Sequence, residues 1–190
     1  MVVDEKALKR CLKEAYRNSS FTVAVSDGRM MINSGYWMVI IDVDEVPSEI
    51  LKEFAGWMRK IPGEGEAYRV CNSKEGPIIQ KQLLQTALSP LDEMEARLID
   101  AMGENPEALM RRTGIRLDNA QVWQNNKDMS VLMVDQRYET MLSSFKDIRR
   151  VGTGLHADDS DSTAWILGLD NRGSAKERLD HLAKFRWVHE

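Results

Sequence analysis

One short segment concentrates the side chains that could carry out acid/base or metal chemistry. It places His156, Asp158, Asp159 and Asp161 within six residues of one another. Carboxylate oxygens suit hard cations, and an imidazole can serve as a ligand or a general base. One hypothesis is therefore a metal-dependent hydrolase. The segment also lacks the glycine and distal glutamate of an EF-hand loop and lies between two strand-like runs, so a solvated turn is the favoured interpretation.

The rest of the sequence gives no sign of covalent catalysis or of a phosphate-binding loop. Neither Cys11 nor Cys71 lies near a histidine in the sequence, and no Gly-x-Ser-x-Gly motif occurs. The glycine pairs at residues 63–65 and 152–154 lack the further glycine or lysine that such loops require. We therefore lean away from an enzyme and expect no cofactor.

A second set of side chains is grouped by helical spacing. Residues 4–18 have apolar positions at helical intervals, with acidic residues in the first turn. At 100° per residue the basic residues gather on the opposite side of this helix: Lys6, Lys9, Arg10, Lys13 and Arg17. A solvated helix face is the usual reason for such a pattern.

Composition indicates an ordinary globular protein. The chain has 190 residues, of which 43% are hydrophobic and 29% charged, and its net charge is −4. The longest apolar run is far shorter than the roughly 20 residues of a membrane span. The N-terminal segment has no apolar export signal, so a cytoplasmic location is expected and no membrane partner.

The elements are predicted around residues 21–42. Alternating apolar residues on both sides of Asp27-Gly28 predict a hairpin with a two-residue turn. The apolar run at residues 36–42 predicts a strand buried on both faces, so three adjacent strands should form the nucleus of a sheet.

The remaining pattern predicts an α+β protein with two sheet-bearing halves, in which amphipathic helices pack on antiparallel sheets. Residues 1–73 form the first half, residues 118–190 the second, and residues 74–117 a helical connector or insertion. Further helices are predicted at residues 46–60, 78–88, 89–103, 107–112, 135–146 and 174–185. Further strands are predicted at residues 67–71, 121–124, 129–134, 151–157 and 163–169.

Two stretches resemble known classes of protein. The opening helix, the hairpin and the run NSGYWMV resemble small proteins of prophages and mobile elements that have no assigned function. The second half, beginning MSVLMVDQRYETMLSSF at Met129, resembles a module of the DNA sliding (processivity) clamps, in which a strand leads into a helix lying across a curved sheet. The first half could be a divergent copy of that module.

The clamp resemblance implies a ring or half-ring whose helices face duplex DNA. The five basic residues of the first helix would then contact the DNA backbone without reading sequence. Duplex DNA, DNA-processing proteins and further copies of the chain become the expected partners. The chain departs from the clamps because it is short for two modules, its middle helices have no clamp counterpart, and its helix at residues 135–146 is not basic.

The favoured function is a non-enzymatic interaction module of prophage origin that associates with DNA in a clamp-like way. The hydrolase is one alternative. A small-molecule binding protein is the other, with an apolar pocket lined by Trp37, Phe54 or Trp165.

Overall fold

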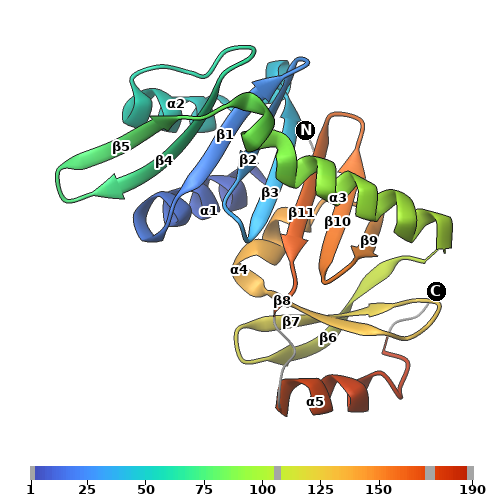
Figure 1. Cartoon of the computed structure of the whole chain (residues 1–190). Coiled ribbons are helices and arrows are strands. Elements are labelled where there is room, and N and C mark those ends of the chain that lie inside the picture. The colour runs from blue at the N-terminus through green and yellow to red at the C-terminus, as the bar shows by residue number, and fades with distance from the viewer. Residues whose placement is uncertain (1–2, 105–107, 170–173, 188–190) are drawn as a thin grey trace.

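The computed structural model describes residues 3–104, 108–169 and 174–187, and they form two antiparallel sheets (Figure 1). The larger sheet contains, in spatial order, β5 (Gly76–Lys81), β4 (Ala67–Ser73), β1 (Phe21–Ser26), β2 (Arg29–Asn33), β3 (Trp37–Asp42), β11 (Ser162–Leu167), β10 (Gly154–Asp159) and β9 (Ile148–Val151). The smaller contains β6 (Met110–Leu117), β7 (Ala120–Asn125) and β8 (Val131–Asp135).

The predicted hairpin is the centre of the larger sheet. Ser26 pairs with Arg29 across the turn, and both turn residues have positive φ, 54° at Asp27 and 71° at Gly28. Positive φ at both positions is the geometry of a type I′ turn, which matches the twist of the flanking strands. β3 is buried at five of its six residues and pairs with β2 on one side and β11 on the other. The three-strand nucleus is confirmed.

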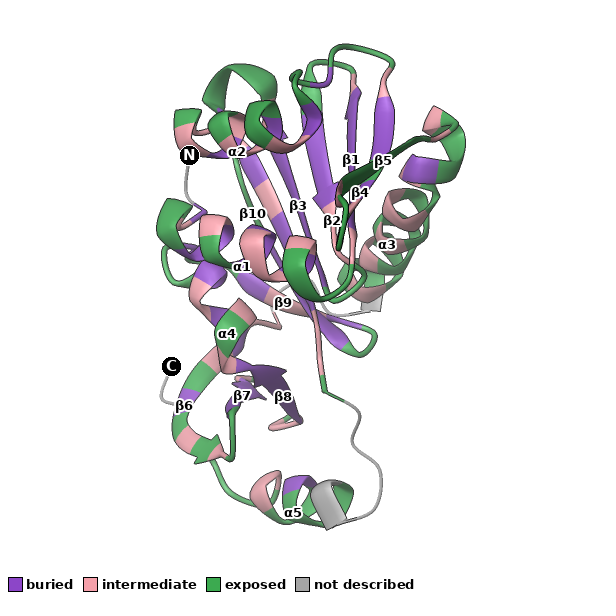
Figure 2. Ribbon diagram, turned by 90° about the vertical axis from the view of Figure 1, so that its left-hand side faces the viewer, coloured by how far each residue is buried: buried purple, intermediate pink, exposed green. Residues whose placement is uncertain are grey.

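Helices cover both faces of the larger sheet (Figure 2). They are α1 (Glu5–Asn18) and α2 (Ser48–Met58) on one face and α3 (Leu84–Glu104) on the other. Alternate strand residues supply the two cores: Val23 and Val39 pack under α1 and α2, whereas Ala24 and Met38 pack under α3. The predicted α+β class, with amphipathic helices on antiparallel sheets, is confirmed.

The smaller sheet lies at one end of the larger one. It is linked there by a bridge between Val134 and Gly168 and by a hydrogen bond from Leu169 N to Met133 O. α5 (Ser174–Leu182) covers its outer face through Leu179, and α4 (Gln136–Glu139) follows β8. No helix in the described parts of the chain is long and apolar enough to cross a membrane.

Two helix predictions were wrong in the middle of the chain. The segment predicted as a helix at residues 78–88 begins as β5, in which Ile78 and Ile79 pair with β4. The β-branched isoleucines suit a strand, and pairing with β4 decides between the two structures. The predicted helix start at Ser89 is also wrong, because α3 runs from Leu84 through Pro90 without a break.

Two further predicted helices differ from the structure: a strand takes the place of most of the first, and the second is shorter than predicted. Of the helix predicted at residues 107–112, residue 107 lies outside the described residues and Met110 already belongs to β6. The helix predicted at residues 135–146 is reduced to α4 and a 3-10 turn at Thr140–Leu142. Residues 74–117 therefore contain β5, α3 and β6, and the division of the chain into two halves and a connector stays a prediction.

Candidate nucleic-acid interface

α1 begins and is oriented as its sequence predicts. The carboxylate of Asp4 accepts a hydrogen bond from Ala7 N at 2.7 Å, which caps the first turn of the helix. The inner face is buried against the sheet by Ala7, Leu8, Cys11, Leu12 and Ala15. The five basic residues therefore point away from the core, and they line one shallow hollow on the surface together with Glu14 and Asn18.

Carboxylates of α2 compensate two of these five cations. Lys9 Nζ lies 2.7 Å from Glu49 and 3.5 Å from Glu53, and Lys13 Nζ lies 2.9 Å from Glu53. Hydrogen bonds from Lys52 and Lys9 lower the pKa of Glu49 to about 2, so this carboxylate stays charged. Lys9 and Lys13 thus serve first to join α1 to α2.

Arg10 is held by neutral groups and keeps its charge uncompensated. Its Nη2 donates to Arg137 O at 3.0 Å and to Thr140 Oγ1 at 2.6 Å, both of which follow β8. These bonds orient the guanidinium without placing a carboxylate beside it. Arg137 itself is paired with Asp135 and Glu14, so it adds little positive charge to the surface.

Lys6 and Arg17 complete the set of available cations. Both are exposed, and within the described residues neither has an ion-pair partner. With Arg10 they stand on the outer side of one helix, from Lys6 to Arg17, a span of about 16 Å at 1.5 Å per residue. A rigid row of cations on this scale can contact several phosphates of a nucleic-acid backbone.

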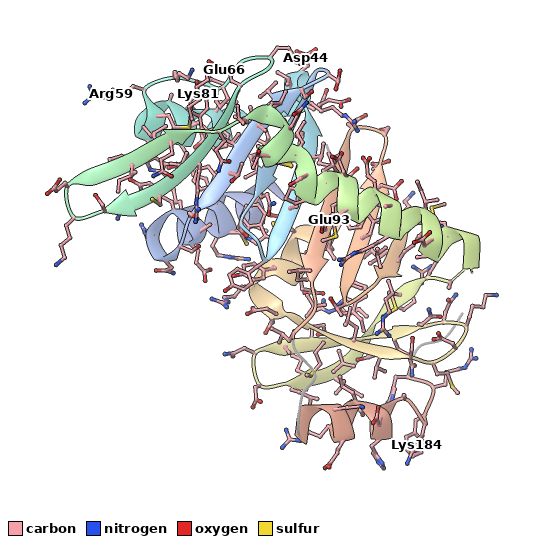
Figure 3. All side chains as sticks on the ribbon, in the orientation of Figure 1. Asp44, Arg59, Glu66, Lys81, Glu93 and Lys184 are labelled. Carbon is pink, nitrogen blue, oxygen red and sulfur yellow. The ribbon has the colours of Figure 1, made fainter. Side chains whose placement is uncertain are left out.

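The opposite face of the sheet carries the opposite charge. Along the outer surface of α3 the described residues 92–100 expose four carboxylates and one arginine, Arg97. Figure 3 shows Glu93 on this helix. α1, in contrast, has five basic and two acidic residues. The molecule is therefore polarised across the sheet, with its basic side at α1.

The fold does not gather the four residues predicted as a metal site around one point. His156 is 3% exposed on β10 and packs on Trp165, with ring centroids 4.1 Å apart. Its Nδ1 is 3.8 Å from the carboxylate of Asp158, Asp159 is the last residue of β10, and Asp161 lies in the turn before β11. Burial lowers the pKa of His156 to about 4. No group of three or more His, Cys, Asp or Glu side chains in the described chain could hold a metal ion, and the hydrolase is not favoured.

The three aromatic residues predicted to line an apolar pocket divide between two places. Trp37 and Trp165 line a small hollow beside the middle of α3, together with Met38, Pro90 and Met94. Phe54 lies on α2 and is fully buried in the core of the other face, to which Trp37 also belongs, and it does not reach this hollow. A common pocket of all three residues is therefore not formed.

Sequence reasoning missed the groups that decide which cations are available. Glu49 and Glu53 are one helical turn apart, and that spacing could have indicated an acidic face able to meet α1. Thr140 gave no such signal, because it lies 130 residues from Arg10 in the sequence.

No protein-family model matches the sequence, and no curated protein matches it either. The solved structures that resemble this one include the DNA polymerase III beta chain of Streptococcus pneumoniae, at 8% identity and a TM-score of 0.37. A putative DNA polymerase III beta subunit of Eubacterium rectale gives 10% identity and a TM-score of 0.38. Both superpositions cover 93% of this chain, and the chain spans 66% of each of those proteins, just under two thirds.

The Helicobacter pylori beta clamp, solved with a DNA ligase peptide, is also similar, with 8% identity, a TM-score of 0.35 and 93% of this chain covered. These are sliding clamps, the class that the second half of the sequence resembles. At these TM-scores the likeness carries no statement about activity. None of the comparisons concerns a prophage origin, which stays a prediction.

Proposed function

We propose that the chain is a non-enzymatic, clamp-like module that holds duplex DNA by its backbone through the outer face of α1. One observation carries the proposal. Lys6, Arg10 and Arg17 are exposed on a helix docked onto the core, and within the described residues no carboxylate is paired with them. Fixed cations bind the phosphates of any sequence, because the phosphate backbone is the same throughout a duplex.

The charge on the two sides of the sheet supports one direction of approach. The acidic surface of α3 would repel a phosphate backbone, while the basic surface of α1 would attract it. The overall net charge of −4 does not oppose this, because attraction over a few ångströms depends on the local face. The α1 face should therefore meet DNA first.

The test is binding of a fluorescein-labelled duplex of about 25 base pairs, followed by anisotropy over a series of salt concentrations. We expect wild type to bind at low salt and to lose affinity as salt rises. Replacing Lys6, Arg10 and Arg17 together by Gln should reduce the slope of log K against log salt by up to ~3, because each phosphate contact contributes about 0.9.

A matched control changes the same number of charges elsewhere. Lys74, Lys81 and Lys146 are exposed and lie outside α1, so their replacement by Gln should leave duplex affinity close to that of wild type. Equal losses in both triple variants would show that total charge and not the α1 face governs binding. No binding by wild type at low salt would reject the proposal outright.

The proposal extends to assembly and to partners. A clamp must surround DNA, so we propose that several copies associate and that DNA-processing proteins bind the assembly. Light scattering on a sizing column, over a range of concentrations, tests the first part. A closed oligomer of constant mass supports it, and a monomer at all concentrations rejects a self-assembled ring.

A further inference from the structure

A second surface, remote from α1, presents aromatic rings to solvent. Phe185 is 50% exposed and Trp187 is 41% exposed in the segment that follows α5. Their ring centroids are 5.8 Å apart at an interplanar angle of 59°, and His181 packs edge-on against Phe185 at 5.5 Å. We call Phe185 and Trp187 the aromatic platform. Exposed aromatic residues that are neighbours in space are unusual on a surface and often mark a binding site.

The aromatic platform is fixed in place by a buried side chain. Gln124 on β7 is 0% exposed, and its Nε2 donates to Phe185 O at 2.7 Å. Its Oε1 accepts from Trp187 N, also at 2.7 Å. One amide thus holds the backbone at both aromatic residues, so binding a ligand would require little further ordering of this segment.

The hydrogen-bonding group of Trp187 is already used. Its Nε1 donates to Leu182 O at 2.8 Å, at the end of α5. What Trp187 can offer a ligand is therefore ring surface and not a hydrogen-bond donor. Phe185 has ring surface alone. A ligand recognised here must be bound mainly by stacking or apolar contact.

Basic residues alternate with the aromatic residues. Lys184 and Arg186 flank Phe185 in the sequence, and both are exposed. Figure 3 shows Lys184 beside α5, at the opposite end of the molecule from Glu66 and Lys81. In residues 176–187 Lys176, Arg178, Lys184 and Arg186 stand against Glu177 and Asp180, so this segment carries a formal excess of positive charge.

We propose that the aromatic platform binds single-stranded nucleic acid, with bases stacked on Phe185 and Trp187 and phosphates near Lys184 and Arg186. Every base has an aromatic face, and each is joined to an anionic phosphate, so the two kinds of side chain here match the two parts of a nucleotide. A protein interface would account for the rings and for Arg186 but not for Lys184, because lysine is depleted there, whereas a nucleotide accounts for all four side chains. Duplex DNA fits less well too, since its bases are stacked on one another.

The test measures binding of fluorescein-labelled oligodeoxythymidylate of about 12 nucleotides to the full chain, by anisotropy at low salt. We expect Trp187→Ala and Phe185→Ala each to weaken binding about tenfold, because stacking of one base is lost. Trp187→Phe should retain most of the affinity. Lys184→Gln with Arg186→Gln should weaken binding and lower its salt dependence while leaving both rings in place.

Two controls separate this proposal from binding through α1. Tyr36→Ala removes a ring that is 60% exposed on another part of the surface, and it should leave single-strand binding unchanged. The triple variant of Lys6, Arg10 and Arg17 should lose duplex binding but keep single-strand binding. If that variant instead loses both, α1 and not the aromatic platform binds the single strand.

Three further results would overturn the proposal. One is no binding of the oligonucleotide by wild type at low salt. Another is unchanged affinity in Trp187→Ala and in the Lys184/Arg186 variant, with fold checked by circular dichroism. The third is binding to vesicles containing phosphatidylserine without binding to the oligonucleotide, which would assign the same rings and cations to a lipid surface.

Discussion

The guanidinium of Arg10 donates to the hydroxyl of Thr140 at 2.6 Å, joining residues that are 130 positions apart in the sequence. This bond ties the outer side of α1 to the 3-10 turn after α4. It also fixes the direction of one of the three cations on the proposed DNA-binding face. The position of that charge therefore depends on the second half of the chain.

Replacing Thr140 by Val should remove this acceptor without changing the charge of Arg10. We expect a loss of about 1 kcal/mol in the free energy of unfolding, because the bond that the hydroxyl accepts from Arg10 and the bond that it donates to Arg137 O at 3.1 Å are both lost at the surface. Urea denaturation measures it. Thr163→Val is the control, since the hydroxyl of Thr163 has no hydrogen-bond partner within the described residues, and a loss of equal size there would contradict the explanation.

Replacing Lys13 by Glu should lower the melting temperature by a few degrees, because the new carboxylate would stand beside Glu53, which now lies 2.9 Å from Lys13 Nζ. Lys6→Glu, which meets no such carboxylate, should have a smaller effect. Thermal melting at low and high salt checks both. The difference in melting temperature between the two variants should shrink as salt rises, because salt screens the repulsion. Adding Glu53→Lys to Lys13→Glu should restore the melting temperature.

His156 should make the protein less stable in acid. Burial lowers its pKa to about 4, below the usual 6.5, so the unfolded chain takes up a proton more readily than the folded one. The neutral His156 therefore contributes to the free energy of unfolding fully above pH 6.5. This contribution, roughly 3 kcal/mol in total, is lost as the pH falls from 6.5 toward 4. Wild type and His156→Phe should be compared by urea denaturation across this range. Identical pH profiles of the two proteins would be the contrary result.

Gly168 lies where the two sheets meet and has no room for a side chain. A Cβ there would collide with the backbone oxygen of Thr153 and with Leu132. Gly168→Ala should lower the free energy of unfolding, measured by urea denaturation, by about 2 kcal/mol or more, because the backbone linking the sheets must shift. Gly103→Ala is the matched control: its Cβ would meet nothing within 4 Å on α3, and it should stabilise the helix by up to ~1 kcal/mol.

The parts of the fold that local chemistry determines were predictable from the sequence. The turn at Asp27-Gly28 needs two positive φ values, and the flanking residues alternate, so the hairpin follows from a few neighbouring residues. The same is true of α1, whose cap and buried stripe lie within one segment. The error at β5 was also local. β5 pairs with the strand just before it, Ser73 with Gly76 across a two-residue turn, but the helical spacing of the apolar residues at 78–88 favoured a helix.

The candidate site was predictable only in part, because side chains of distant elements decide which of its cations are compensated. The five basic residues of α1 do share one surface, as the helical period requires. Which of them remain available depends on Glu49, Glu53 and Thr140, which belong to other elements. The aromatic platform depends on Gln124, which is 61 residues before Phe185. The spacing of charged residues in the sequence shows which face of a helix is basic. Which of those charges are paired with carboxylates depends on how the helix packs against other elements.

The pairing of β3 with β11 has a consequence for the order of folding during synthesis. β1, β2 and β3 are made early, but the strand that covers the free edge of β3 begins only at Ser162. At about 5–20 residues per second, the ribosome needs on the order of ten seconds to make the intervening chain. During that time an apolar strand has an unpaired edge, which is the kind of surface that promotes aggregation. The nascent chain is therefore most vulnerable in this interval, and a chaperone that binds exposed strands would act on it there.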